Sequence, residues 1–140
     1  ATHPHERNRA SYLAENFAPL AEAQLLQLVD GECEFAPGVR VIPTPGHTPH
    51  HQSVLIDDGH GNKALFLGDV VPTSIHVKLP FIMAYDLDVV ATLETKRRTL
   101  GRAIDERWLV IFGHDKDLSA GYLGYDAKGS ITVAERAPIT

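Results

Sequence analysis

The sequence Thr-Pro-Gly-His-Thr-Pro-His-His at residues 44–51 decides the fold, and two shorter stretches repeat its pattern. Residues 66–69 are Phe-Leu-Gly-Asp, and residues 111–115 are Ile-Phe-Gly-His-Asp. In each case an apolar run leads to a glycine, which is followed by a side chain that can bind a metal ion. The apolar run predicts a strand, and the glycine permits a sharp exit from the sheet.

His47, Asp69 and His114 are therefore expected on loops that leave the ends of strands. Strands that end on one edge of a sheet bring such side chains together. Two imidazoles and a carboxylate suit a metal ion of borderline softness, most naturally zinc. A simpler interpretation exists for each residue: a turn residue for His47, a cap for Asp69 and a surface residue at a strand end for His114.

The order of these motifs resembles the metallo-β-lactamase superfamily over nearly the whole chain. Its members carry a His-x-His-x-Asp-His motif, then a Gly-His-Thr histidine, a Gly-Asp aspartate and a late Gly-His histidine. The last three correspond to His47, Asp69 and His114. The resemblance implies an α/β fold that forms the C-terminal half of an αββα sandwich, with residues 1–140 as a single partial domain.

The first motif of the family is absent from this sequence. Its closest match, His-Pro-His-Glu-Arg-Asn at residues 3–8, has arginine and asparagine where the family has aspartate and histidine. Arginine stays protonated and does not bind metals, and an amide is a poor zinc ligand. We interpret His3 and His5 as part of a polar chain start. Because the chain begins with Ala1 rather than methionine, we expect it to be the C-terminal part of a longer protein.

The resemblance also implies a chemistry. It assigns His47 to a first metal, His114 to a second, and Asp69, the catalytic residue, to a bridge between them. Two zinc ions, or other divalent metal ions, would hold a hydroxide that attacks an ester, a lactone or a phosphotriester. This chain would supply three ligands of an otherwise incomplete site. His51 is expected to orient a ligand or close its turn, and Asp115 to orient His114 or cap the next turn.

The remaining histidines have weaker assignments. His76 belongs to a long loop predicted at residues 70–85, and such loops form pockets or lids. It either lines the substrate pocket or is merely exposed. His60 is expected to be exposed at the tip of a hairpin. His50 replaces a glycine that is usual in the family, which is expected to tilt the turn without removing the preceding ligand.

The substrate class follows from the branch of the family that the chain resembles. Four segments are similar to lactonases and organophosphate hydrolases: residues 68–71, 79–80, 85–88 and 121–124. Glyoxalase-type thioester hydrolases are less similar and remain an alternative. β-Lactamases fit poorly, because Asp69 stands where their zinc enzymes often use cysteine. A different alternative is a non-catalytic remnant that binds a partner and keeps vestigial ligand residues.

Composition restricts the partners. A net charge of −5 argues against nucleic acid, and the basic residues 96–98 are predicted on a solvated helix face. No apolar run reaches the length of a membrane span, and the single cysteine, Cys33, excludes an internal disulfide. We therefore expect a small-molecule substrate, no nucleic acid and no membrane partner. A cytoplasmic location is favoured, and a homodimer remains open.

Periodicity and turn signals predict the elements. Helices are expected from Ser11 to about Gln27 and from Asp86, as the cap, to about Arg107. The second helix is expected to bury Val90, Leu93, Leu100 and Ile104 and to pair Glu94 with Arg98. Strands are predicted at residues 39–44, 53–56, 63–67 and 108–112, a last hairpin at 122–135, and turns at 31–38.

Overall fold

The computed structural model describes residues 5–137, and its contacts divide the chain into two compact units, Ala1–Asp30 and Gly31–Thr140. The first unit contains a 3₁₀ turn, η1 (Arg9–Ser11), and a helix, α1 (Ala14–Glu22), which buries none of its residues. This helix is shorter than predicted. It ends because Gln24 adopts a left-handed backbone with φ of 56°, a conformation that stops a right-handed helix.

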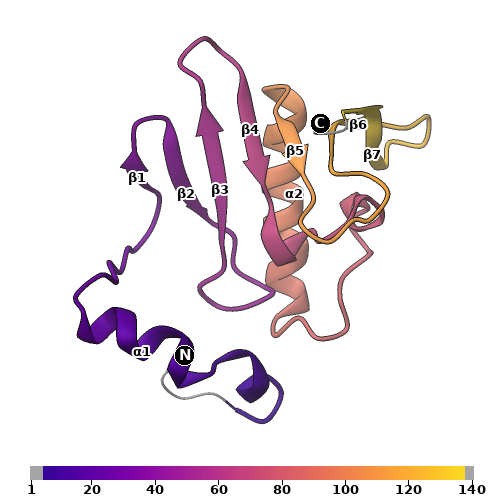
Figure 1. The fold of residues 1–140 in the computed structure, drawn as a ribbon. Coiled ribbons are helices and arrows are strands. Elements are labelled where there is room, and N and C mark those ends of the chain that lie inside the picture. The colour runs from indigo at the N-terminus through magenta and orange to yellow at the C-terminus, as the bar shows by residue number, and fades with distance from the viewer. Residues whose placement is uncertain (1–4, 138–140) are drawn as a thin grey trace. The chain divides into compact units, whose positions relative to one another are not determined.

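The second unit is built on a mixed sheet of seven strands, whose order in the sheet follows their order in the chain (Figure 1). All neighbouring strands are antiparallel except β4 and β5, which are parallel. The strands are β1 (Cys33–Ala36), β2 (Val39–Pro43), β3 (Gln52–Asp57), β4 (Lys63–Phe66), β5 (Leu109–Ile111), β6 (Ala120–Tyr125) and β7 (Ile131–Arg136). The predicted α/β class is confirmed.

Most strands lie where the sequence predicted them. The β3–β4 hairpin closes on Asp58, whose carboxylate accepts the N–H groups of His60 and Asn62. The β6–β7 hairpin closes in the same way on Asp126. The prediction of turns at residues 31–38 is confirmed at both ends of this range but was wrong for residues 33–36, where β1 forms as a short edge strand. Its four residues lack a strong apolar pattern and are ordered by pairing with β2.

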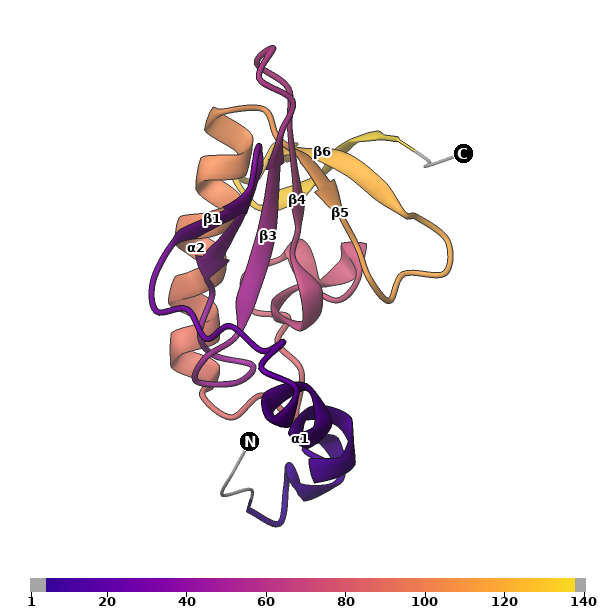
Figure 2. The ribbon, with the colours of Figure 1, turned by 60° about the vertical axis from the view of Figure 1, so that its left-hand side comes forward.

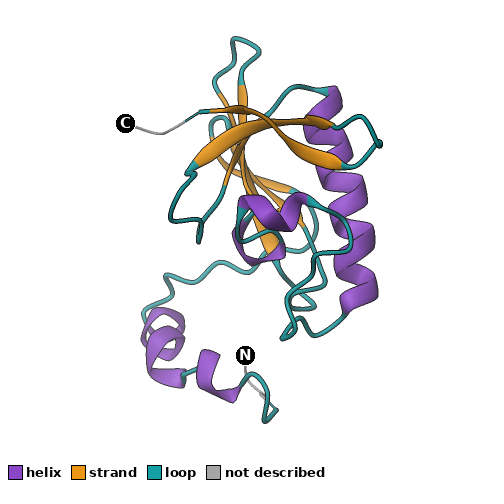
Figure 3. Cartoon of the chain, turned by 90° about the vertical axis from the view of Figure 1, so that its right-hand side faces the viewer, coloured by secondary structure: helices purple, strands orange, loops and turns teal. Residues whose placement is uncertain are grey.

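The parallel pair requires a crossover connection, and this connection contains the helix α2 (Val89–Asp105). Between β4 and α2 lie two 3₁₀ turns, η2 (Gly68–Val70) and η3 (Ser74–Val77), in the segment predicted as one long loop. Figure 2 shows α2 packed along one face of the sheet, and Figure 3 shows it as the longest helix. None of the helices in the described part of the chain is long and apolar enough to cross a membrane.

On β3 and at the end of β4, buried and exposed residues alternate with the period of two of a strand. On β3, Leu55 is 2% exposed, whereas its neighbour Ile56 is 42% exposed. On β4, Leu65 is buried and Phe66 is 39% exposed. Trp108 precedes β5 and is fully buried in the same core cluster. One side of these strands is therefore packed, and the other leaves apolar side chains open.

The predicted buried face of α2 is confirmed only in part. Leu100 is fully buried and Ile104 packs against the core, but Leu93 is only half-buried. Val90 is 66% exposed. The buried residues are mainly polar: Thr92, Thr95, Lys96, Thr99, Leu100 and Ala103. The prediction that residues 96–98 form a solvated face was therefore wrong for Lys96, which is 1% exposed. Glu94 pairs with Arg97 rather than with Arg98. Tertiary contacts, as well as apolar periodicity, determine this face.

Candidate metal centre

The three predicted ligands leave the same edge of the sheet. His47 follows β2, Asp69 lies in η2 directly after β4, and His114 follows β5. β2 runs in the same direction as β4, because both are antiparallel to β3, and β5 is parallel to β4. The carboxyl ends of all three strands therefore meet at one edge, which explains the convergence that the sequence predicted.

Asp69 lies between the two histidines. One of its carboxylate oxygens, Oδ1, is 2.7 Å from Nε2 of His114. The other, Oδ2, is 3.6 Å from Nε2 of His47. The side chain of His47 is only 17% exposed, whereas those of Asp69 and His114 are 47% and 63% exposed. The group is thus buried at His47 and open to solvent at His114.

His47 is oriented by a residue whose role the sequence did not reveal. Its Nδ1 is 2.9 Å from Oδ1 of Asp86, which is 3% exposed. The other oxygen of Asp86 accepts a hydrogen bond of 2.8 Å from the hydroxyl of Thr92. Because a carboxylate only accepts, Nδ1 of His47 carries a proton, and its Nε2 faces Asp69.

The prediction that Asp86 caps α2 was wrong. The cap is Asp88, whose carboxylate accepts the N–H of Ala91 at 2.9 Å. Two aspartates stand before this helix, and only one can cap it. The presence of a second aspartate could therefore have indicated that one of the two has another role. Nothing near Asp86 in the sequence identifies His47 as its partner.

Glycine 46 allows the loop that carries His47 to approach α2. Its φ is 138°, and a Cβ at this position would lie 2.3 Å from the hydroxyl oxygen of Thr92. The loop is then fixed from both sides. The hydroxyl of Thr95 donates to the carbonyl of Pro45 at 2.7 Å, and the N–H of Asp88 donates to the carbonyl of Gly46 at 3.0 Å.

His51 holds the turn of Asp69 through a series of hydrogen bonds in which each donor and acceptor can be assigned. Its Nε2 accepts the N–H of Asp69 at 3.2 Å, so its Nδ1 carries the proton and donates to the hydroxyl of Thr44 at 2.8 Å. Thr44 donates to Ser53, and Ser53 donates to the carbonyl of Leu67. Burial, and then the charge of His47, lower the pKa of His51, which agrees with this neutral tautomer.

Asp115 accepts four hydrogen bonds, none of them from His114. Oδ1 accepts the N–H groups of Asp117 and Leu118, and Oδ2 accepts the N–H and hydroxyl of Ser74. Burial acts to raise the pKa of Asp115, but these hydrogen bonds outweigh it and hold the pKa at about 2. Asp115 therefore caps its own turn and ties it to the start of η3.

Among the described residues, the other histidines named in the prediction have hydrogen bonds of their own or are exposed. His76 is half-buried and pairs with the hydroxyl of Thr73 at 2.7 Å. Burial, and then the charge of Lys96, lower its pKa. His60 is exposed. His5 accepts the N–H of Arg7 in the first unit, and His3 lies outside the described residues. Within residues 5–137 no three histidine, cysteine, aspartate or glutamate side chains form a ready metal cluster.

Comparison with known proteins identifies the family. The model of the metallo-beta-lactamase superfamily matches residues 1–114. The chain belongs to this superfamily. An N-acyl homoserine lactonase of Bacillus cereus is 30% identical over 115 residues, which are 81% of this chain and 44% of that protein.

Two solved structures share the fold of this chain. A probable metal-dependent hydrolase from Staphylococcus aureus has a TM-score of 0.80 at 24% identity, over 98% of this chain and 48% of that one. The dizinc quorum-quenching lactonase AidC has a TM-score of 0.71 at 20% identity, over 99% and 46%. This chain therefore matches about half of each of these two structures. The chain spans less than half the length of the Bacillus relative.

Proposed function

We propose that this chain contributes part of the metal centre of a hydrolase that opens lactones or cleaves related esters or phosphotriesters. The placement of Asp69 carries the proposal. Its two oxygens face two different imidazoles, so one carboxylate can serve two cations and offset their repulsion. The relative from Bacillus cereus is named an N-acyl homoserine lactonase, which favours a lactone.

The donor atoms fit a divalent metal such as zinc. His47 offers the lone pair of Nε2, and its other ring nitrogen is held by the buried carboxylate of Asp86, an arrangement common for metal-binding histidines. Asp69 and His114 add oxygen and nitrogen donors, which zinc accepts. His51 is not a ligand in this proposal, because both of its ring nitrogens are hydrogen-bonded. Two metals need more ligands than these three residues supply.

The residues of this chain would orient the metal ligands and contact the substrate. A divalent metal bound here would lower the pKa of a bound water and polarise the carbonyl of the substrate. Asp86 fixes the ring of His47, and His51 fixes the backbone of Asp69. The ring of Tyr85 lies 6.0 Å from that of His47 and is 58% exposed, so it is available to contact a substrate. AidC, a neighbour in fold, is a dizinc lactonase.

Replacement of Asp69 tests the proposal. Asp69→Ala should sharply weaken zinc binding, measured by competition with a chromophoric chelator, because it removes both oxygens between the imidazoles. In a protein that also carries the His-x-His-x-Asp-His motif, the same change should abolish lactone hydrolysis. His60→Ala is the matched control and should alter neither, because His60 is exposed in a hairpin tip.

The outcomes separate the alternatives. Unchanged zinc affinity in a folded Asp69→Ala protein would overturn the assigned site. Zinc binding with turnover of thioesters but not lactones would favour a glyoxalase-type hydrolase. Absence of zinc binding in the unmodified protein, together with a stable protein complex, would favour the non-catalytic remnant.

A further inference from the structure

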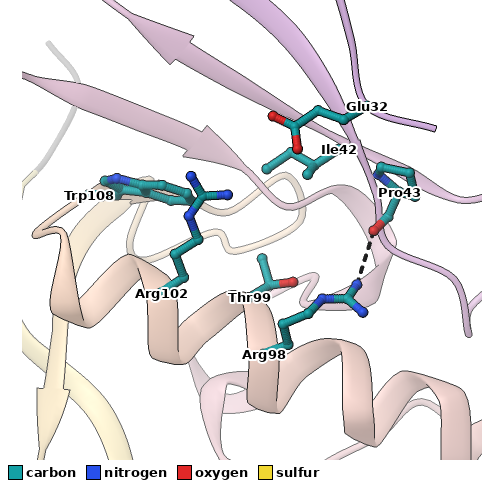
Figure 4. Close-up of a pocket in the computed structure, with 7 residues that line it drawn as sticks. All are labelled: Glu32, Ile42, Pro43, Arg98, Thr99, Arg102 and Trp108. Atoms are coloured by element: carbon teal, nitrogen blue, oxygen red, sulfur yellow. Dashed lines mark hydrogen bonds between the residues drawn. The ribbon is translucent and has the colours of Figure 1, made fainter.

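Polar side chains of α2 bind the segments around the candidate metal centre. Thr92 holds Asp86, and Thr95 holds the carbonyl of Pro45. Arg98 donates to the carbonyl of Pro43 at 3.2 Å, at the end of the strand that leads to His47 (Figure 4). These contacts fix the loop before His47. They do not involve Lys96, a buried residue of the same helix whose ammonium makes its contacts elsewhere.

Lys96 binds three carbonyl oxygens of one short segment. Its Nζ donates to the carbonyls of Lys78, Leu79 and Phe81 at 2.7, 3.2 and 2.7 Å. An ammonium has three N–H donors, so all of them are used within residues 78–81. No ion pair between described residues includes Lys96. Its contacts therefore hold backbone rather than neutralise a carboxylate.

The segment that Lys96 holds leads directly to Asp86. Residues 78–88 connect η3 to α2, and within them Phe81 donates its N–H to the carbonyl of Lys78 and Asp86 donates its N–H to that of Met83. Lys96 fixes the beginning of this segment. Its end is fixed where Leu87 and Asp88 donate N–H groups to the carbonyls of His47 and Gly46. Asp86 lies between these two attachments, and Tyr85 is presented beside His47.

We propose that Lys96 is a positioning residue, which holds residues 78–81 against α2 so that Asp86 reaches Nδ1 of His47. Lys96 does not contact His47 itself in this proposal. It fixes residues 78–81, and this segment places the carboxylate of Asp86 against His47. Burial lowers the pKa of Lys96 to about 8, against the opposing effect of Asp86. A buried ammonium is costly unless it is fully hydrogen-bonded, which agrees with a specific role for its three contacts.

The hydrogen-bonded Nδ1 proton of His47 gives a readout that needs no metal. In the metal-free protein this proton should give a slowly exchanging, downfield NMR signal, because it is held by a buried carboxylate. Lys96→Met keeps the length of the side chain and removes all three donors. We expect the signal to be lost or to exchange at least about tenfold faster. We also expect zinc affinity to fall about tenfold, which is the lower end of the effect of residues that orient a metal ligand.

Two variants control for local charge and for lost stability. Arg97→Met removes a neighbouring cation, which pairs with Glu94 on the exposed face, and should leave the His47 signal unchanged. Thr99→Ala alters the same buried face without touching residues 78–81, and should lower the melting temperature while the signal remains. If Lys96→Met does not fold, Lys96→Gln, which retains two donors, is judged by the same signal.

The two readouts distinguish this inference from the proposed function, on which only the zinc measurement rests. An unaltered His47 signal in a folded Lys96→Met or Lys96→Gln protein would overturn the positioning role. Equal loss of the signal in Thr99→Ala would do the same, because it would reflect general loosening. If the signal changes as expected but the unmodified protein binds no zinc, the positioning role stands and the metal-site proposal fails.

Discussion

At the scale of single residues, Asp86 and Asp88 show how two identical side chains at the start of one helix differ in role. Asp86→Asn should weaken zinc binding about 10–100-fold, because the amide removes the charge behind His47 and disturbs its tautomer. Asp88→Asn is the matched control, since asparagine caps a helix as well as aspartate does. Equal effects of both changes in a zinc titration would show that Asp86 matters only for the helix.

Lys96 gives the stability of the folded chain a definite pH dependence. Its pKa is about 8 when folded and 10.5 when unperturbed. Below pH 8 both states are protonated. Between these values the unfolded chain binds more protons, so the free energy of unfolding should rise with pH, by about 3 kcal/mol at most. His76, whose pKa is lowered, stays neutral throughout.

Denaturant unfolding at several pH values checks this dependence. The unmodified chain is compared with Lys96→Met, because the difference isolates Lys96 from tyrosines that titrate in the same range. The variant should lack the rise. A parallel pH profile in both proteins would mean that Lys96 keeps an ordinary pKa.

The sequence could predict where His47, Asp69 and His114 lie, because each follows an apolar strand and a glycine. It could not predict the partners of His47 and Lys96. Asp86 satisfies the local rule for a cap as well as Asp88 does. Lys96 lies within a basic cluster, which suggested a solvated face. Its three acceptors are backbone carbonyls, and because every residue has one, the sequence does not indicate which of them are bound.

At the scale of elements, β3 separates a packed face from an open one. Leu55→Ala should lower the free energy of unfolding by about 2–5 kcal/mol, as for a buried leucine. Ile56→Ala, at the adjacent position, should cost less than about 1 kcal/mol, because Ile56 is 42% exposed. Urea unfolding of both variants checks this. A similar cost at Ile56 would reveal that something covers the open face in solution.

Elements with a clear period or turn signal were predictable, and elements ordered by their neighbours were not. The β3–β4 hairpin carries Asp58 and two glycines in its turn, so local chemistry determines it. β1 has only the support of β2. The apolar positions of α2 correctly indicated a helix and the burial of Leu100. They did not indicate that Thr92, Thr95 and Lys96 are also buried, because these side chains donate to acceptors that lie elsewhere in the sequence.

At the scale of the whole molecule, the number of donors limits the metal content. Three candidate ligands should hold at most one zinc ion per 140-residue chain. Hydrolysis of lactones and phosphotriesters by this chain should be negligible, because nothing in the proposed set fixes a second cation. Elemental analysis and activity assays on one purified sample check both points. Two tightly bound zinc ions with full turnover would mean that other residues or a second chain complete the site.

The order of the strands has a consequence for how the chain folds. From β1 to β4 each strand pairs with the one just before it, and the same holds from β5 to β7. These two meanders can form by local loop closure, which is fast. The pairing of β4 with β5 must wait until α2 has been traversed. We therefore expect the first meander to form while its β4 edge is still unpaired, and we expect the parallel contact, which is the least local, to form more slowly.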